Sequence, residues 1–391
     1  MQKWTTTLSI DYENKLLLEV FTENTLFFDI ETTGFSPATT QLYLIGCAKR
    51  CDDKMMIEQY FAERKEDEAT ILSCFLKLLS DYQTIITFNG MGFDIPYIKA
   101  KCDSYHLEET FAAKDYIDLF KITSALKFLL KLPNYKQKTI EQFLGIARED
   151  IYDGGQLITI YKEYVRHPSE HQMHFLKQHN YEDVLGMLDL LPILSYSNLL
   201  KGGYTISAVE SNVYTDYDGN SQKELIFLLK NEFPVPKQVS YGYQEFYLTC
   251  HGEDSKLSIK LYEGELKYFF ENYKDYYYLP DEDIAIHKDI AASVDKAFRK
   301  KATASTCYTK KDSIFLPQYQ QIVEPAFSKE RKDKVSYFEL SDAFIDSNEL
   351  LHNYIDHILK LMAKQKHSPQ DTHQKKSKAK TLIFLQGTKR K

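Results

Sequence analysis

Two carboxylates interrupt an apolar segment near the start of the chain. The stretch LFFDIETTGF, residues 26–35, has the composition of a buried strand, yet it contains Asp29 and Glu31. Side chains alternate between the two faces of a strand, so residues two apart point the same way. Two carboxylates about 4 Å apart repel by roughly 4 kcal/mol at an effective dielectric of about 20. A bound cation would relieve this repulsion, although a salt-bridged structural pair is the alternative for these two residues taken alone.

Two further acidic positions follow along the chain. Asp94 comes directly after a glycine-rich turn, in FNGMGFDIPYI, which follows the short β-branched run TIITF at residues 84–88. Asp183 lies in the helical stretch HNYEDVLGMLDLL, with His179 four residues earlier. Residues four apart share one face of a helix, so His179 and Asp183 are predicted to point at the same place.

The order DxE, then NGxxFDxP, then a helical HNxxD resembles the DEDD exonucleases of the ribonuclease-H-like superfamily. Within that superfamily it is most similar to a bacterial branch of predicted exonucleases. The resemblance covers roughly residues 20–200, about half of the chain. It implies a nuclease that removes nucleotides from a free 3′ end of DNA or RNA.

The resemblance also implies a metal site. In such enzymes four carboxylates hold two divalent ions about 3.5–4 Å apart, and these ions stabilise the attacking and leaving oxygens. Oxygen ligands with spare coordination positions suit Mg²⁺ or Mn²⁺. By this likeness Asp29 would bridge the ions, Glu31 would hold the ion that activates water, and Asp94 and Asp183 would complete the site.

Substrate contacts are carried over in the same way. The backbone at Thr32, Thr33 and Gly34 would lie beside the terminal nucleotide, because a glycine permits close approach. Asn89 is a further candidate for substrate contact. Both Asn89 and Asn180 equally suit hydrogen bonding within a turn or a helix.

The chain departs from the family pattern at the general base. The family uses a His five residues before the last Asp or a Tyr four before it, whereas here these positions hold Gln178 and His179. An imidazole titrates near neutrality, so His179 can still orient or deprotonate water. The alternatives are that His179 is a surface or core histidine, or that His174 is the base. This departure concerns the base and not the metal site.

Apolar spacing and turn residues predict an α/β domain over the first 200 residues, a ribonuclease-H-like mixed sheet flanked by helices. A helix is expected to begin at Asp94. Asp115 and Asp118 are expected at a strand end and a helix cap. The predicted strands are 26–31, 42–47, 55–61, 84–88 and about 113–117, and the other predicted helices are 66–82, 119–131, 139–145, 155–166 and 169–200.

The composition changes after residue 200. Residues 201–345 contain 15 of the 29 tyrosines and are predicted to form an accessory α+β or mostly β domain. A hairpin is expected to turn at Glu263-Gly264. The tyrosines at 273–278 suit a half-buried sheet surface, or alternatively stacking on bases. Residues 346–391 are expected to form a C-terminal helix from about Asn348 to Lys364, capped by Asp346 or Ser347, and a disordered basic tail.

Charge and composition bound the class of protein. The chain has a net charge of −7, but nine Lys/Arg and one Asp give residues 364–391 a charge of +8, so the remainder carries −15. An acidic body argues against a protein that coats nucleic acid by charge alone. The tail is either a solvated extension or a nucleic-acid tether.

No apolar run approaches the roughly 18 residues of a membrane span, and the first residues lack a secretory h-region. Six cysteines without metal-ligand spacing suit reduced thiols. A cytoplasmic protein with no membrane partner is expected. The rival to an exonuclease is a nucleic-acid-binding protein whose nuclease-like domain is a non-catalytic scaffold.

Overall fold

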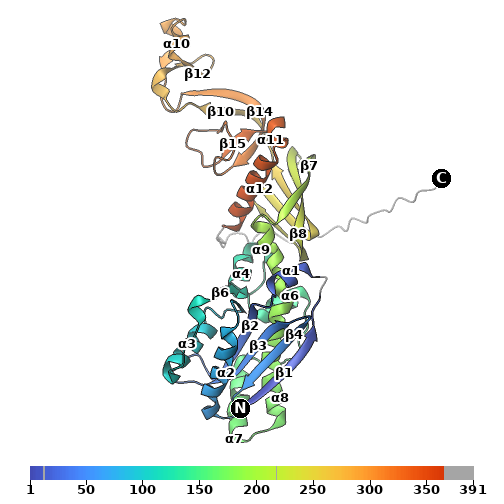
Figure 1. Cartoon of the computed structure of the whole chain (residues 1–391). Helices are drawn as coiled ribbons and strands as arrows, with labels where there is room; N and C mark the ends of the chain where they lie inside the picture. Colours follow the sequence, from blue (N-terminus) through green and yellow to red (C-terminus); the bar gives the residue numbers. More distant parts are fainter. Residues whose placement is uncertain (12–13, 217, 365–391) are drawn as a thin grey trace, which may run out of the picture.

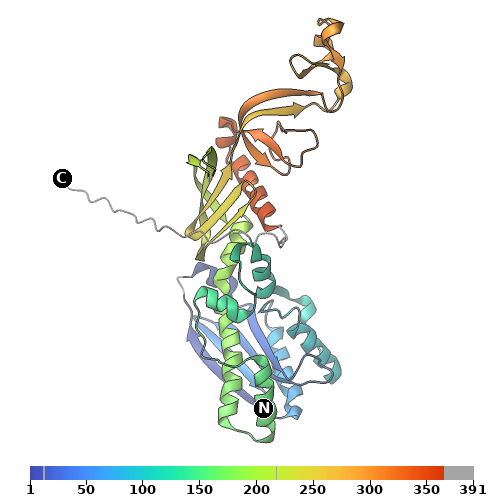
Figure 2. The same ribbon diagram turned by 180° about the vertical axis from the view of Figure 1, so that it is seen from behind.

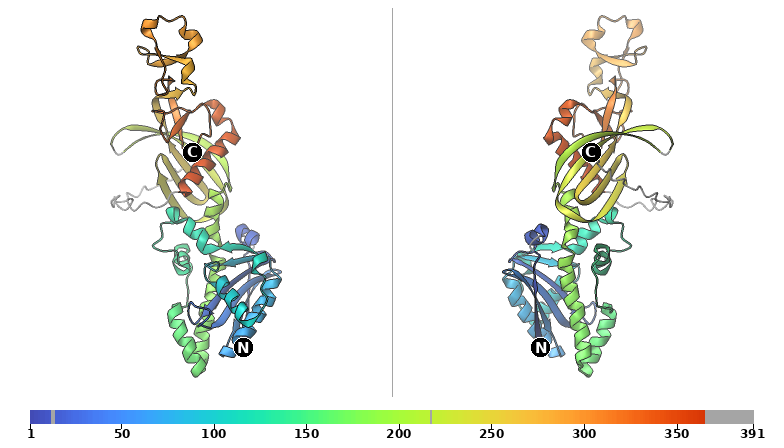
Figure 3. Two further views of the ribbon diagram at one scale, coloured as in Figure 1. Left: turned by 90° about the vertical axis from the view of Figure 1, so that its left-hand side faces the viewer. Right: turned by 90° about the vertical axis from the view of Figure 1, so that its right-hand side faces the viewer.

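The structure, a computed structural model, describes residues 1–11, 14–216 and 218–364. The α/β part that holds the first 200 residues lies at one end, a curved sheet lies in the middle, and a narrow β arm lies at the other end (Figures 1 and 3). The predicted basic tail at residues 365–391 lies outside the described residues.

A six-stranded mixed sheet organises the first part, in the order β1-β4-β3-β2-β5-β6. Neighbours from β1 to β2 are antiparallel, and β2, β5 and β6 are parallel. This confirms the predicted mixed α/β sheet and adds the edge strand β1, which the sequence did not predict because QKWTTTLS has few large apolar residues. The strands are β1 Gln2–Ser9, β2 Thr25–Thr32, β3 Leu42–Cys51, β4 Lys54–Phe61, β5 Thr84–Thr87 and β6 Asp115–Asp118.

Helices cover both faces of this sheet. The helix predicted at 119–131 is divided in two, and the one predicted at 169–200 is interrupted by a short 3₁₀ turn that contains Pro192, because proline cannot donate a backbone hydrogen bond. The helices are α1 Lys15–Val20, α2 Glu68–Ser80, α3 Asp94–Tyr105, α4 Leu119–Ala125, α5 Lys127–Leu130, α6 Gln137–Leu144, α7 Gly154–Arg166, α8 Glu170–Asp189 and α9 Leu194–Leu200.

The two faces of β2 have different surroundings. Leu26, Phe28 and Ile30 pack in a core with α2 and α3, where the rings of Phe28 and Phe75 lie 5.0 Å apart. Phe27 faces the opposite core, which includes Val184 of α8. Alternation therefore places Asp29 and Glu31 on the side of α8, which runs along the sheet in Figure 2.

One helical stretch, Glu170–Leu200, is long and apolar enough to cross a membrane by composition alone. Its most apolar window is 61% buried inside the protein. Such burial is typical of a core helix, since α8 packs against β2, β3 and β4 and α9 packs against β8.

The rest of the described chain is mostly β, as predicted. It holds three three-stranded sheets, β7-β8-β9, β10-β14-β15 and β12-β11-β13. The strands are β7 Tyr204–Thr215, β8 Ser221–Tyr243, β9 Phe246–Lys260, β10 Tyr262–Phe269, β11 Tyr276–Leu279, β12 Ile284–His287, β13 Lys300–Lys301, β14 Tyr308–Gln318 and β15 Ser336–Glu339. The helices are α10 Lys288–Ala291, α11 Asp342–Ile345 and α12 Asn348–Ala363.

The hairpin predicted at Glu263-Gly264 is wrong. Gly264 lies within β10 and pairs with Ser313 of β14, while β9 pairs with β8. The chain leaves one sheet and enters another near Leu261, so the pairing is set by distant partners and not by a local turn. Tyr276, Tyr277 and Tyr278 are half-buried on β11, in agreement with the sheet-surface interpretation.

The predicted C-terminal helix is confirmed, and its cap is Ser347, whose hydroxyl accepts a hydrogen bond from the Leu350 N–H. Tyr354 of α12 packs against Phe227 of β8 and Phe338 of β15. This helix therefore shares its core with the β region.

The close contact between α8 and the sheet depends on Gly46 of β3. A Cβ at this position would lie 2.1 Å from Asn180 Oδ1 and 2.8 Å from Val184 Cγ2. Both atoms belong to α8, so any larger residue must push this helix away from β3. A glycine inside a strand is often the sign of such a close approach.

We expect Gly46→Ala to destabilise the protein by about 1–3 kcal/mol or more, the usual cost of overpacking a core. Chemical denaturation of the metal-free protein measures this loss of stability. Gly154→Ala is the matched control, because a Cβ there has no atom within 4 Å and Gly154 begins α7. That control should be neutral or stabilising by up to about 1 kcal/mol. Equal stability of Gly46→Ala and wild type would contradict the proposed constraint.

Candidate active site

The predicted site residues come from three elements and converge at one place. Asp29 and Glu31 belong to β2, Asp94 is the first residue of α3, and His179 and Asp183 lie on α8. Ligand atoms of Glu31, His179 and Asp183 all lie within 4.8 Å of one another. The side chains of these three residues are 12%, 8% and 19% exposed, so the group is largely enclosed.

Asp94 is held against β2 by a backbone hydrogen bond. Its Oδ1 accepts the N–H of Ile30 at 3.1 Å, and its side chain is buried. The turn before it is fixed by Asp118, which caps α4 and also accepts the N–H of Asn89 at 3.0 Å. Asn89 adopts a positive φ of 65°, which asparagine tolerates in turns. The predicted capping role of Asp118 is confirmed, and Asp115 is an exposed strand-end residue that accepts from Gln83.

Asp29 is oriented by a chain of two side-chain amides, Asn180 of α8 and Gln59 of β4. The Asn180 side chain donates to Asp29 Oδ2 at 3.1 Å. Its own carbonyl accepts from Gln59 of β4 at 3.0 Å, and Asn180 is fully buried. Asn180 is therefore a hydrogen-bond partner of the Asp29 carboxylate, a hydrogen-bonding role that its sequence position also suits.

His179 faces the carboxylates with one ring nitrogen and a third acid with the other. Its Nε2 lies 3.4 Å from Glu31 Oε1 and 3.2 Å from Asp183 Oδ2. Its Nδ1 lies 2.7 Å from Asp150 Oδ2. Because an ionised Asp150 can only accept, Nδ1 carries a proton in this pair. The histidine is therefore part of the site and not a surface residue.

The loop between α6 and α7 supplies residues that the sequence alone did not identify. Asp150 is held by the Lys138 ammonium at 2.7 Å, and its N–H donates to Glu182 of α8 at 3.0 Å. Arg148 bridges Glu141 and Asp183 through its guanidinium. The local sequence AREDIYD contains no motif that distinguishes these residues from an ordinary solvated loop.

Gln178 and His174 do not join this group. Gln178, at one family position for the base, donates to Glu182 at 2.5 Å. His174 is exposed, and its ring contacts Phe175. Among the described histidines, His179 is the one that contacts the clustered carboxylates.

The predicted substrate residues lie in the loop after β2. Thr32 Oγ1 donates to the Gly34 carbonyl at 2.9 Å, and Thr33 Oγ1 accepts the N–H of Gln41 at 2.8 Å. A Cβ at Gly34 would lie 2.8 Å from Thr40 Cγ2, so this loop needs a glycine there. The side chains therefore shape the loop, and their contact with substrate remains a prediction, as does that of Asn89.

Burial and mutual repulsion shift the pKa values of the carboxyl groups. Burial raises the pKa of Asp29 well above its ordinary value, and the charges of Asp94, Asp183 and Glu31 add to this. Burial likewise raises the pKa of Glu31 to about 7 and that of Asp94 to about 7. For His179, burial lowers the pKa, but the carboxylates of Glu31, Asp183 and Asp150 together raise it above its ordinary value.

These shifts and the donor set fit a divalent cation. Asp29, Glu31, Asp94 and Asp183 present carboxylate oxygens, the ligands that Mg²⁺ and Mn²⁺ prefer. Arg148 reaches Asp183 and His179 reaches Glu31, but no described Lys or Arg side chain forms an ion pair with Asp29, Glu31 or Asp94. Among the described residues, His179 is therefore the cationic partner of Glu31, and no lysine or arginine pairs with Asp29 or Asp94.

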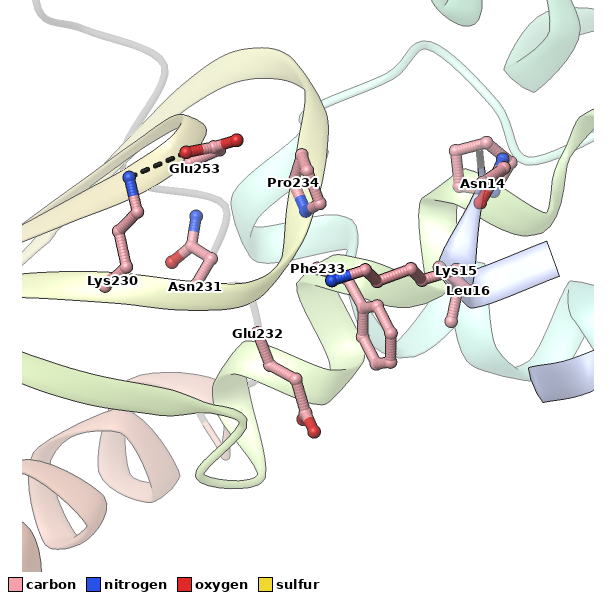
Figure 4. A pocket seen from close by; sticks show the side chains of 10 residues that line it. Asn14, Lys15, Leu16, Lys230, Asn231, Glu232, Phe233, Pro234 and Glu253 are labelled. Atoms are coloured by element: carbon pink, nitrogen blue, oxygen red, sulfur yellow. Dashed lines mark ion pairs between the residues drawn. The ribbon is translucent and has the colours of Figure 1, made fainter. Parts of the chain in front are cut away.

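A separate cavity of about 470 Å³ lies between α1 and β8, where Lys15, Phe233 and the Lys230–Glu253 ion pair line it (Figure 4). None of the five clustered residues lines this cavity. This cavity is therefore not part of the carboxylate site.

Comparison with protein families agrees with the fold and the motifs. Residues 26–195 match the family model of the RNase_H superfamily. This part of the chain is therefore a ribonuclease-H-like domain, as the order of motifs predicted.

A curated relative and two solved structures show where similar domains occur. The uncharacterized protein YprB of Bacillus subtilis (strain 168) is 25% identical over 171 residues, which are 43% of this chain and 41% of YprB. The chain thus spans less than half the length of that relative. E. coli exonuclease I in complex with a dT13 oligonucleotide is 12% identical with a TM-score of 0.33, over 53% of this chain and 55% of that one. The family B DNA polymerase of Pyrobaculum calidifontis is 15% identical with a TM-score of 0.36, over 46% and 25% of the two chains.

The raised pKa values predict how the stability of the metal-free protein depends on pH. An unfolded carboxyl group has a pKa of about 4, so a folded pKa of about 7 for Asp94 means that the folded state prefers the proton. Its stabilising contribution is full below about pH 4 and is lost as the pH rises through about 7. Asp94→Asn removes the charge and keeps an acceptor for Ile30. In EDTA at pH 8 we expect it to raise Tm by about 2–4 °C per kcal/mol gained, with a clearly smaller change at pH 5.

Asp118→Asn is the control of opposite sign. Asp118 is also buried, but its oxygens accept several backbone N–H groups, so neutralising it should lower Tm. Thermal unfolding monitored by circular dichroism measures both variants. If Asp94→Asn melts at or below the wild-type temperature at pH 8, Asp94 is not under electrostatic strain.

Proposed function

We propose that this chain is a divalent-metal-dependent nuclease that hydrolyses phosphodiester bonds of DNA or RNA, removing nucleotides from a free 3′ end with two Mg²⁺ or Mn²⁺ ions. The observation that carries this proposal is the enclosed convergence of Asp29, Glu31, Asp94, His179 and Asp183 from β2, α3 and α8. The ribonuclease-H-like domain supports a nuclease. The polarity and the exonuclease mode rest on the resemblance of the motifs.

Three of the four carboxylates have a partner that orients them and leaves the other side of the group free to bind. Asn180 orients Asp29, the Ile30 N–H orients Asp94, and Arg148 orients Asp183. These three acids, with Glu31, would hold the ions. When bound, the ions would neutralise the charge that develops on the phosphate and on the attacking and leaving oxygens.

His179 is proposed to be the general base. The Nδ1–H bond to Asp150 fixes the ring and its tautomer, so that Nε2 points toward the carboxylates. In the metal-free geometry Nε2 faces Glu31 and Asp183, which favour its protonated form. With those two carboxylates engaged by cations, Nε2 would release its proton to solvent and could then accept one from water.

The first test is metal uptake. We expect calorimetry to detect Mn²⁺ binding by the wild type, and we expect Asp29→Asn to abolish it or weaken it sharply because the proposed bridging ligand is lost. Asp115→Asn, which changes an exposed acid in the same sheet, should bind as the wild type does. Equal binding by the wild type and Asp29→Asn would remove the basis of the proposal.

The same proteins should then be incubated with DNA and RNA oligonucleotides labelled at either end, with Mn²⁺ or with EDTA. We expect the wild type and Asp115→Asn to release mononucleotides from the 3′ end in a cation-dependent way. Asp29→Asn should release none. Oligonucleotide binding without cleavage would favour the non-catalytic scaffold instead.

The second test concerns the base. His179→Ala should reduce the single-turnover rate by roughly 10²–10⁴-fold, the usual contribution of general acid–base catalysis. Asp150→Asn should reduce it less, because the base remains but loses its orienting carboxylate. His174→Ala is the matched control, an exposed histidine on the same helix, and should cleave normally. Mn²⁺ affinity should change little in all three variants. A wild-type rate in His179→Ala would show that another group accepts the proton.

A further inference from the structure

A buried tyrosine hydroxyl lies beside the carboxylate site without a hydrogen-bond partner. Tyr43 of β3 is 0% exposed, and its hydroxyl oxygen has no partner among the described residues. Buried polar groups are nearly always hydrogen-bonded, and leaving one unpaired destabilises the fold. An orphaned hydroxyl in this position therefore needs an explanation.

The ring that stacks on Tyr43 provides the contrast. Tyr161 of α7 lies parallel to Tyr43, with ring centroids 4.1 Å apart. The Tyr161 hydroxyl donates to the Ala62 carbonyl at 2.9 Å and accepts from Gln41 at 2.9 Å. Of these two stacked tyrosines in one core, only Tyr161 thus has a hydrogen-bonded hydroxyl.

An irregularity in the sheet places Tyr43 at this point. Glu31 of β2 pairs with Leu44, but the next residue, Thr32, pairs with Leu42, so Tyr43 is left unpaired in a β-bulge. Bulges re-aim side chains and are common beside active sites. The bulge falls directly opposite the second carboxylate of the site.

The hydroxyl at this position is a hydrogen-bond donor. Burial raises the pKa of Tyr43 well above its ordinary value, and the nearby Glu31 carboxylate, with Tyr161 and Asp29, adds to the rise. A tyrosine hydroxyl has one proton to donate in a hydrogen bond. A carboxylate that accepts this proton in a hydrogen bond would satisfy it.

We propose that Tyr43 is a positioning residue, whose hydroxyl donates to the Glu31 carboxylate when Glu31 serves as a cation ligand. The proposal rests on the metal site of the proposed function. Without cations Glu31 Oε1 lies 3.4 Å from His179 Nε2, and the Tyr43 hydroxyl lies near Glu31 without forming a well-aligned hydrogen bond. When Glu31 leaves the histidine for a cation, Tyr43 is the buried donor beside it and fixes the orientation of the carboxylate.

Tyr43→Phe tests this proposal with two measurements of opposite sign. Removing an unpaired hydroxyl should leave the metal-free protein as stable as the wild type or more stable, by denaturation in EDTA. The same change should weaken Mn²⁺ binding by roughly 10–100-fold, the usual effect of losing a partner of a metal ligand. In a Glu31→Gln background, Tyr43→Phe should produce no further loss of affinity, because the carboxylate that it orients is gone.

Tyr161→Phe is the matched control. It should destabilise the metal-free protein, since the Ala62 carbonyl and the Gln41 amide lose their partner, and it should leave Mn²⁺ affinity unchanged. Wild-type Mn²⁺ affinity in Tyr43→Phe would overturn the proposal, as would a loss of metal-free stability equal to that of Tyr161→Phe. If Asp29→Asn abolishes binding while Tyr43→Phe does not, the metal site stands and only the role of Tyr43 fails. If the wild type itself binds no Mn²⁺, the proposed function fails first.

Discussion

The fold holds Asp29, Glu31 and Asp94 together in a place where water screens them poorly. Each of these groups has a raised pKa, with burial as the first cause in every case. Like charges enclosed in this way oppose folding by several kcal/mol unless they are protonated or bound by cations. The surrounding structure is understandable as a frame that withstands this repulsion. In the proposed function, the empty site would give up stability for affinity toward a divalent ion.

Helix α8 is the main member of that frame. It brings Asn180 to Asp29 and His179 to Glu31, and it can do so only because Gly46 lets it touch β3. Gly186 does the same on another side of the helix, since a Cβ there would lie 2.1 Å from Glu141 Oε1. Gly46 therefore allows α8 to lie close to the sheet, and Gly186 allows it to lie close to the Glu141–Arg148 ion pair. Small residues on both elements set the distance at which the polar groups meet.

Much of this arrangement follows from local sequence. Period-two alternation put Asp29 and Glu31 on one face, helical spacing put His179 and Asp183 on one face, and the glycine-rich turn put Asp94 at the start of a helix. Those signals concern a few adjacent residues, and the structure agrees with each of them.

What the sequence did not reveal depends on partners far along the chain. Asp150 meets His179 across 29 positions, and Tyr43 approaches Glu31 through a bulge that no turn residue marks. The supposed hairpin at Glu263-Gly264 failed for the same reason, because β10 pairs with β14 and not with β9. Gly46 was not singled out either, although a glycine inside an apolar strand is often the sign of a close approach.

The helical run that carries the site also joins it to the rest of the molecule. After α8 the chain turns at Pro192 into α9, which packs on β8, and Tyr196 of α9 accepts the N–H of Lys237 at 3.1 Å. One apolar core extends from Val184 of α8 to Tyr354 of α12 without a break at residue 200. A flexible linker would let the β region swing freely, whereas a shared core fixes its direction relative to the carboxylates. The position of the β region relative to the carboxylates is therefore set by apolar packing that continues through residue 200.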